Sequence, residues 1–222
     1  MKLRHFLILR EIMTRLLFSP ILLFFCLVLA VSAQEQMIDF EDKFEGKLQD
    51  GWSWVRENEE TKRFAENALE IRMEPFADVE AKNVLSRLAP KRIANHPYAV
   101  ELNFRCTKPF SKQYQQTGLY WVQNNKTVFK FVRELIDGQL YVFPGKIPVT
   151  GDEVTLKVIV NGENVVAEFQ PEGETVFRRV YEGKLPAATD DEQIGIQCWH
   201  GPENEDSWIR FKKFRIFKHD EK

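Results

Sequence analysis

The chain has few of the residues that build metal centres and nucleophilic active sites. Its 222 residues include only three cysteines and four histidines. The histidines are far apart, and none has the ligand spacing of a zinc site. A glycine-rich phosphate loop and a G-x-S-x-G nucleophile turn are also missing. These absences argue against zinc enzymes, nucleotide-dependent enzymes and serine hydrolases of the usual kinds. We expect no cofactor, with calcium as the one candidate.

Basic stretches are lacking as well. The 31 lysines and arginines nearly balance the 33 aspartates and glutamates, which gives a net charge of −2. The mature chain after removal of the N-terminal segment is more acidic still. Without a basic arm or stripe, the chain has no electrostatic footprint for DNA or RNA, so we expect no nucleic-acid partner. Long helical signals are absent too, since no amphipathic helix of three turns is predicted after Met37.

The long apolar run of the chain lies near its N-terminus. Leu16 to Val31 is apolar apart from Ser19 and Pro20, follows a basic start, and leads into small residues up to Ala33. This order predicts a secretory signal peptide cleaved after Ala33. An uncleaved membrane anchor is the alternative, but the run is shorter than the roughly 20 residues of a spanning helix. We therefore expect a secreted or periplasmic protein with no membrane span after cleavage. The expected organisation is a signal peptide at 1–33, a lead-in at 34–37, one domain at 38–218 and a tail at 219–222.

Two cysteines stay in the mature chain, Cys106 and Cys198. In an oxidising compartment they could form one disulfide between distant strands. Two separate buried thiols are equally compatible with the sequence. A bridge requires Cα atoms within about 7 Å, and spacing along the chain does not decide this.

The densest strand signal runs from Gly118 to Pro144. Two dipeptides interrupt it, Asn124-Asn125 and Asp137-Gly138, and both tolerate the positive φ of short hairpin turns. Aromatic and β-branched residues fill the segments between them. This pattern predicts a three-stranded antiparallel meander in the middle of a large sheet.

Strand signals also fill the rest of the domain. Tyr98–Cys106 alternates most cleanly, with apolar residues at every second position from Val100 and polar residues between them. Asn161-Gly162 is the strongest short hairpin signal. Further strands are predicted at Leu69–Met73, Val84–Arg87, Val154–Val160, Val165–Phe169, Thr175–Glu182, Ile194–His200 and Trp208–Lys218.

Many short strands with frequent turns predict an all-β domain. A two-sheet antiparallel sandwich, preceded by the N-terminal signal helix, suits the length. An up-and-down barrel is the alternative.

Short segments in a fixed order carry a family resemblance. They read GWSWVRE, ALEIRM, YAVELNF, GLYWVQNNKTVFKFVRE, IGIQCWHG and IRFKKFRIF, and together they span nearly all of residues 38–218. In this order the chain resembles the concanavalin A-like lectin/glucanase superfamily of jelly-roll sandwiches. It is most similar to bacterial extracellular domains of unknown function and to the accessory domain of β-xylosidase-type glycoside hydrolases. Its closing strands also resemble a domain described as a 3-keto-disaccharide hydrolase.

The resemblance implies a ligand site on the concave sheet. Sugar recognition needs a flat aromatic ring for the C–H face of the sugar and a few fixed polar groups for its hydroxyls. Side chains that could supply this mixture, if their faces coincide, are Trp199, Tyr120, Arg105, Gln197, Glu101 and Lys130. The competing interpretation is that Trp199 and Tyr120 belong to the core and the charged residues form a solvated face.

A catalytic pair of acids is not apparent. Glycoside hydrolysis uses two carboxyl groups roughly 5–10 Å apart. Glu101 has Asn103 where the acidic partner would stand, and Asp137, three residues after Glu134, is committed to a turn. We therefore expect a secreted, non-catalytic domain that binds polysaccharide or oligosaccharide. A hydrolase acting on a glycoside or sugar derivative is the alternative, and a structural envelope protein is a second one.

An acidic loop follows Trp199. His200, Glu203, Glu205 and Asp206 offer oxygen and nitrogen groups, and carboxylates are the ligands that Ca²⁺ prefers. The spacing is not that of a known calcium loop, so a solvated loop is the favoured interpretation.

Asn125-Lys126-Thr127 is a glycosylation sequon at a predicted hairpin tip. It matters only in a host that modifies such sites, because the acceptor asparagine must be exposed to a glycosylating enzyme.

Overall fold

The computed structural model describes residues 39–75 and 81–220. The predicted signal peptide and lead-in therefore lie outside the described residues. Within the described ranges the chain is built from strands, with one short 3₁₀-helix, η2 (Glu59–Thr61), and no α-helix. None of the described helices has the length and apolar character that crossing a membrane would require.

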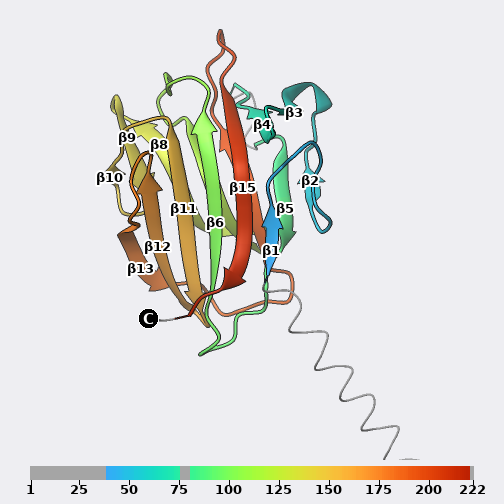
Figure 1. Cartoon of the computed structure of the whole chain (residues 1–222), viewed down its shortest axis with the longest axis vertical. Coiled ribbons are helices and arrows are strands. Elements are labelled where there is room, and N and C mark those ends of the chain that lie inside the picture. The colour runs from blue at the N-terminus through green and yellow to red at the C-terminus, as the bar shows by residue number, and fades with distance from the viewer. Residues whose placement is uncertain (1–38, 76–80, 221–222) are drawn as a thin grey trace, which may run out of the picture. The chain divides into compact units, whose positions relative to one another are not determined.

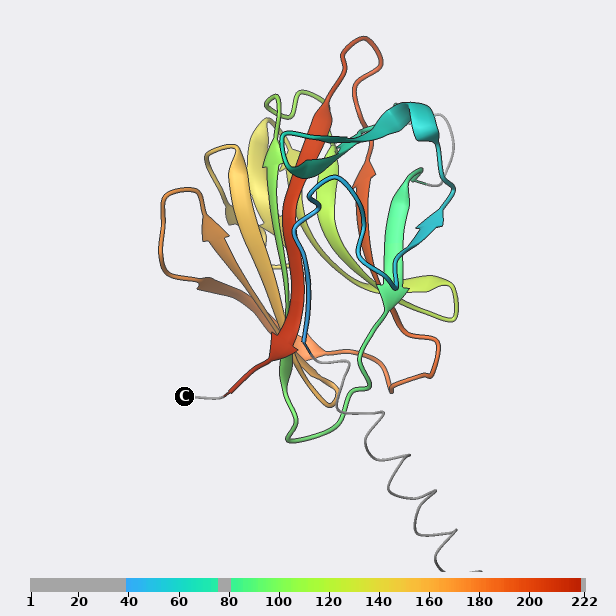
Figure 2. The same cartoon turned by 45° about the vertical axis from the view of Figure 1, so that its right-hand side comes forward.

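The strands form two antiparallel sheets that pack face to face (Figures 1 and 2). The eight-stranded sheet contains β13 (Arg178–Lys184), β12 (Asn164–Pro171), β11 (Glu153–Asn161), β6 (Tyr98–Cys106), β15 (Trp208–Lys218), β4 (Ala68–Arg72) and β3 (Lys62–Ala65), with β1 (Phe40–Asp42) beside β15. The seven-stranded sheet contains β10 (Ile147–Pro148), β9 (Gln139–Phe143), β8 (Lys126–Ile136), β7 (Gln116–Gln123), β14 (Gln193–Trp199), β5 (Val84–Leu88) and β2 (Ser53–Val55). The predicted jelly-roll sandwich is confirmed and the barrel alternative is wrong, because the two sheets do not close on each other.

The core lies between the sheets and follows from alternation. Leu102 on β6 is opposite Leu156 on β11 and Phe214 on β15, and all three are fully buried. On the facing sheet, Leu119 and Phe131 pair across β7 and β8 and are also buried. Because successive side chains point to opposite faces, each sheet turns one apolar face inward and keeps its other residues outside.

The predicted meander is confirmed as β7, β8 and β9. Asn124 and Asn125 join the first two strands with φ of 49° and 60°, and Asp137 and Gly138 join the next two with φ of 52° and 75°. Consecutive positive φ values match the two-residue turns whose twist fits a hairpin. The hairpin predicted at Asn161-Gly162 also forms, although Asn161 is the last residue of β11 and the turn lies one residue further on.

Four short strands were not predicted from the sequence: β1, β2, β3 and β10. β3 carries two basic residues in four, and β10 is two residues long and ends in a proline. Both features weaken a strand pattern while suiting the edge of a sheet, where proline and charge are tolerated.

Cys106 and Cys198 are two separate, buried free thiols in the structure. Both point into the core, from β6 in one sheet and β14 in the other. The thiol arrangement, rather than the disulfide, is therefore the one observed.

Candidate functional site

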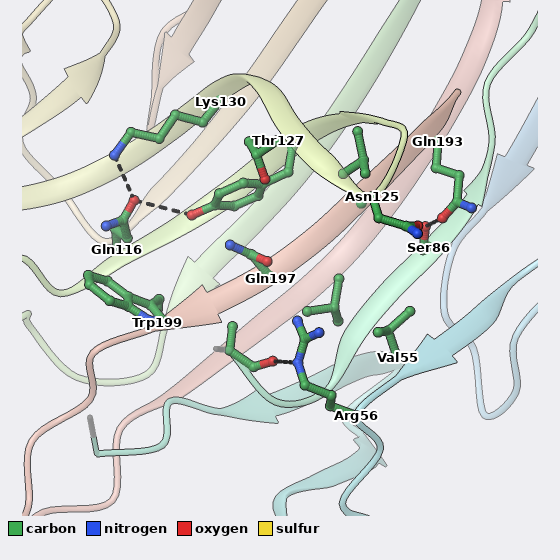
Figure 3. Close-up of a pocket in the computed structure, with 15 residues that line it drawn as sticks. Val55, Arg56, Ser86, Gln116, Asn125, Thr127, Lys130, Gln193, Gln197 and Trp199 are labelled. Carbon is green, nitrogen blue, oxygen red and sulfur yellow. Dashed lines mark hydrogen bonds between the residues drawn. The ribbon is translucent and has the colours of Figure 1, made fainter. Parts of the chain in front are cut away.

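A cleft of about 730 Å³ lies on the outer face of the seven-stranded sheet (Figure 3). Its lining comes from five strands and the turns beside them. The residues that line it are Val55, Arg56, Ala81, Val84, Ser86, Gln116, Tyr120, Val122, Asn125, Thr127, Lys130, Gln193, Gly195, Gln197 and Trp199. The cleft-lining positions of β7 and β14 alternate with core positions such as Leu119 and Ile196, so the same alternation builds the core and the cleft.

The floor of the cleft is a row of cross-strand neighbours. Gly195 on β14 pairs with Ser86 on β5 and with Tyr120 on β7, and Tyr120 pairs with Lys130 on β8. A Cβ atom at Gly195 would make only ordinary contacts, 3.5 Å from Val84 Cγ1 and 3.9 Å from Tyr120 Cβ. The missing side chain of Gly195 therefore leaves open space in the floor, and nothing in the packing requires glycine there.

A β-bulge shapes one wall. Thr127 and Lys130 are three residues apart on β8, and in a regular strand their side chains would point to opposite faces. The register shifts between these positions, since Trp121 pairs with Phe129 while Val122 pairs with Thr127. Val128 is the extra residue, and it allows both Thr127 and Lys130 to face the cleft.

A hydrogen-bond network fixes the polar groups around Gln116 (Figure 3). Its Oε1 accepts from the Tyr120 hydroxyl at 3.2 Å and from Lys130 Nζ at 3.1 Å. Its Nε2 donates to Glu134 Oε1 at 3.5 Å, and Lys130 Nζ lies 3.5 Å from Glu134 Oε2. Burial raises the pKa of Tyr120, so its phenol stays protonated and acts as a donor. The network holds the Gln116 amide in one orientation.

The opposite rim is tied down by local contacts. Ser86 Oγ donates to Gln193 Oε1 at 2.7 Å, and Arg56 Nε donates to the carbonyl of Ala81 at 2.6 Å. Behind this rim, the Asn83 amide bonds to both the backbone N–H and the carbonyl of Asn58, at 2.6 and 3.0 Å. The segment that carries Arg56 is thereby held against the start of β5.

Trp199 stands at one end of the cleft, beside Gln116 and Gln197 (Figure 3). Its ring is half-buried, and its centroid lies 5.1 Å from that of His200. Four amide side chains share the cleft with this ring, from Gln116, Asn125, Gln193 and Gln197, together with the hydroxyls of Ser86, Thr127 and Tyr120. An aromatic surface with amides and hydroxyls around it suits a ligand that has apolar C–H faces and many hydroxyl groups.

Four of the six candidate residues come together here: Trp199, Tyr120, Gln197 and Lys130 all line the cleft. The sequence analysis placed Tyr120 either in the core or at the site, but the structure shows that it is both buried and part of the cleft. Its side chain is 5% exposed and still forms part of the cleft wall.

Glu101 and Arg105 lie elsewhere, which corrects their place in the candidate set. Both are on β6, in the middle of the eight-stranded sheet, and face away from the core on the opposite side of the sandwich. Glu101 forms an ion pair with Arg215 at 2.7 Å, and Arg105 lies 3.9 Å from Glu172. Alternation along β6 correctly grouped these two residues on one face, but it carried no information about which sheet contains β6.

Carboxylates are scarce at the cleft. Among the described residues that line it there is no aspartate or glutamate. The nearby Glu134 is 5% exposed and engaged by Gln116 and Lys130. The described part of the cleft therefore lacks the pair of carboxyl groups that glycoside hydrolysis uses.

The acidic loop after Trp199 pairs its carboxylates with cations of the chain. Glu203 lies 3.5 Å from Lys112, Glu205 lies 3.1 Å from Lys108, and Asp206 lies 3.2 Å from Arg72. Over residues 39–75 and 81–220, no group of three or more histidine, cysteine or acidic side chains could hold a metal ion. Calcium binding by this loop, with His200 as a further ligand, gains no support from this arrangement.

Several cleft residues escaped the sequence analysis. Gln116 precedes Tyr120 by four positions, and Gln193 precedes Gln197 by four, so period-two alternation extended backwards finds both. Ser86 and Asn125 had no such signal, because they enter the cleft through strand pairing and a hairpin turn.

Comparison with known proteins supports the fold. No protein-family description matches the chain, and no curated protein sequence matches it. Solved structures do match. The GH43 protein BlXynB from Bacillus licheniformis superposes with a TM-score of 0.63 at 15% identity, covering 81% of this chain and 39% of that one. A xylan β-1,4-xylosidase from Bacillus halodurans C-125 gives a TM-score of 0.57 at 16% identity, covering 79% and 38%. An alginate lyase from Corynebacterium sp. gives 0.52 at 9% identity, covering 73% and 82%.

These similarities establish the concanavalin A-like jelly-roll sandwich as the fold, as the sequence resemblance implied. The chain spans about two fifths of the length of the two larger proteins. At such identities the likeness concerns the fold, and a fold of this kind hosts binding modules, enzymes and structural domains alike.

Proposed function

We propose that this protein is a secreted domain that binds oligosaccharide or polysaccharide in the cleft of the seven-stranded sheet without hydrolysing it. One observation carries the proposal: a single cleft combines the half-buried ring of Trp199 with four amide side chains and three hydroxyls. Amides donate and accept together, as sugar hydroxyls do, so one amide can serve adjacent hydroxyls of a ring. The ring supplies the apolar surface for the C–H face of a sugar.

The structural neighbours support carbohydrate as the ligand class. Two of them are named as a xylan β-1,4-xylosidase and an alginate lyase. Xylan is a neutral polysaccharide, and alginate is an acidic one. These two polymers are therefore the first probes to use, because a preference between them also reports the charge of the preferred ligand.

Binding is favoured over hydrolysis because no aspartate or glutamate is among the described residues that line the cleft. Glu134 accepts from Gln116 just outside the cleft lining, and it is already paired with Lys130. A two-carboxylate mechanism needs a second acid at a fixed distance. Incubation with xylan or alginate, followed by detection of new reducing ends or unsaturated products, tests the enzymatic alternative. Steady product release by the purified protein would replace the binding proposal with an enzymatic one.

The envelope-protein alternative predicts a sheet face filled by its own side chains. The cleft of about 730 Å³ counts against that alternative, since a purely structural face gains dispersion energy by filling such space.

Secretion rests on the N-terminal sequence and is tested separately. The mature protein should be found outside the cytoplasm and should begin at Gln34 when its N-terminus is sequenced. Recovery of the full-length chain in the membrane fraction would support the anchored alternative instead.

The binding test uses two tryptophan variants. Trp199→Ala removes the ring from the cleft, and we expect it to weaken binding to the preferred polysaccharide at least about tenfold. Trp208→Ala is the matched control, because Trp208 is also half-buried but lies on β15, where Arg63 covers its ring at 4.1 Å. Affinity electrophoresis or calorimetry measures both. Equal effects of the two variants, or no binding of xylan, alginate or a wider glycan panel by the wild type, would reject the proposal.

A further inference from the structure

One row of side chains continues beyond the cleft. Trp199 on β14 pairs with Gln116 on β7, Gln116 pairs with Glu134 on β8, and Glu134 pairs with Tyr141 on β9. Residues directly opposite each other in an antiparallel sheet share a face. The four side chains therefore form a line across four neighbouring strands. With strands about 4.8 Å apart, three spacings separate Trp199 from Tyr141 by about 14 Å.

The far end of this row is aromatic. Tyr141 and Phe143 are both half-buried and lie on the same face, two residues apart, with ring centroids 6.1 Å apart. Lys146 Nζ lies over the Tyr141 ring, 5.3 Å from the ring centroid. Tyr141 is outside the set of residues that line the cleft, so it forms a second aromatic surface at the other end of the row from Trp199.

The middle of the row is polar and held in place. Gln116 and Glu134 are linked to each other at 3.5 Å, and Lys130 reaches both of them. Two aromatic surfaces with fixed amide and carboxylate groups between them repeat the alternation of C–H faces and hydroxyls along a sugar chain. The spacing of about 14 Å between the ends exceeds a single sugar ring, so one ring cannot contact both.

We propose that the row is the path of an oligosaccharide chain that crosses the strands, with one sugar unit on Trp199 and a more distant unit on Tyr141. This inference rests on the proposed binding function and adds a second subsite and a chain-length requirement to it. Affinity should rise with chain length until the ligand spans the row. The ring of Tyr141 supplies the gain for the longer chains, and short fragments bind at the Trp199 end without it.

The experiment is a titration with size-graded fragments of xylan and of alginate, each from the disaccharide to the hexasaccharide. Wild type is compared with Tyr141→Ala and Tyr141→Phe, and with Tyr181→Ala as a half-buried tyrosine of the eight-stranded sheet. We expect Tyr141→Ala to leave the affinity for the shortest bound fragments unchanged and to lower that for the longest about tenfold. Tyr141→Phe keeps the ring and should keep the gain, which guards against a folding defect in the alanine variant.

The outcomes separate the two proposals. If wild type binds and Trp199→Ala abolishes binding, but Tyr141→Ala weakens short and long fragments equally or has no effect, the path does not reach Tyr141 and this inference fails alone. If wild type binds no fragment of either polymer and no other glycan, the binding function fails and the inference with it. A chain-length gain that is lost in Tyr141→Ala and retained in Tyr141→Phe supports both.

Discussion

The two sheets of the sandwich have outer faces of opposite character. On the eight-stranded sheet, acids meet bases across the strands: Glu101 pairs with Arg215 at 2.7 Å, and Lys157 pairs with Glu168 at 2.8 Å. On the seven-stranded sheet, the outer face carries amides, hydroxyls, aromatic rings and a glycine around a cleft. Both outer faces arise from the same alternation of side chains along the strands. The two faces therefore differ only in which residue types occupy the outward positions.

The comparison shows how one sheet face becomes a closed surface while the other keeps a cleft. A carboxylate and a basic side chain opposite each other neutralise each other's charge and satisfy each other's hydrogen bonds. A face made of such pairs has few free groups with which to bind a ligand. An amide offers two donors and an acceptor with two lone pairs, more than one neighbour uses, so capacity remains for a ligand. Three experiments sharpen or break this contrast, and a fourth tests the core between the two sheets.

The largest effects are expected at two glycines of the seven-stranded sheet. Gly195→Leu fills the floor of the cleft and should eliminate polysaccharide binding while the fold stays intact, since a Cβ there makes only ordinary contacts. Gly118→Ala should instead destabilise the fold by about 3 kcal/mol or more, because its Cβ would lie 2.3 Å from the carbonyl oxygen of Phe131. Binding assays and thermal unfolding measure the pair.

A binding-competent Gly195→Leu variant would show that the ligand does not enter this cleft. A Gly118→Ala variant of wild-type stability would show that β7 and β8 can separate locally at little cost.

The next effect concerns pH and the eight-stranded sheet. Burial acts to raise the pKa of Glu70, but hydrogen bonds from Arg210 and Arg63 outweigh it, so the pKa is lowered below the ordinary 4.5. A lowered folded-state pKa contributes stability that is present above the unfolded pKa and is lost as the pH falls through the folded value. Glu70→Gln should therefore cost about 2 kcal/mol at neutral pH and lose less stability than wild type below pH 4.5.

Urea unfolding at neutral and acidic pH checks this prediction, with polysaccharide binding of the folded variant as the control. A parallel loss of stability in wild type and variant on acidification would contradict the role of Glu70.

Two lysine variants, one on each sheet, should have smaller and opposite effects on stability and on ligand affinity. Lys157 and its partner Glu168 are 13% and 15% exposed, so Lys157→Met should cost about 1 kcal/mol of stability and leave ligand affinity unchanged. Lys130 is 44% exposed and holds the Gln116 amide, so Lys130→Met should leave stability almost unchanged and lower affinity about threefold. Unfolding and binding are measured on both, and the reverse pattern would break the contrast between the two faces.

The two cysteines of the native protein are expected not to react with thiol reagents. Burial raises the pKa of Cys106 to about 11 and that of Cys198 to about 12, so both thiols stay protonated at pH 8. Thiol reagents should label neither before unfolding and both afterwards. A mass two hydrogens lower, with no labelling after unfolding, would show that the disulfide has formed instead.

Sequence reasoning predicted the strands more reliably than it predicted which candidate residues lie together. Tyr98–Cys106 and Trp208–Lys218 were predicted with the bounds that the structure has, because long alternating runs between clear turns are a strong local signal. The structure brings Trp199, Tyr120, Gln197 and Lys130 together because the meander and β14 are neighbours in one sheet. Glu101 and Arg105 were misplaced because β6 pairs with β11 and β15, which are distant in the sequence. The proximity of the candidate residues on β7, β8 and β14 thus depends on strand pairing, which local sequence patterns do not encode.

By itself, then, the sequence determined the all-β class, the hairpin turns and which residues of a regular strand share a face, since these depend on neighbours along the chain and on a period of two. Only the tertiary structure decided which strands share a sheet, that the bulge at Val128 turns Thr127 into the cleft, and that Trp199, Gln116, Glu134 and Tyr141 form one line. The physical reason is that pairing between distant strands is selected by burial of whole sheet faces, and this selection involves the entire chain at once.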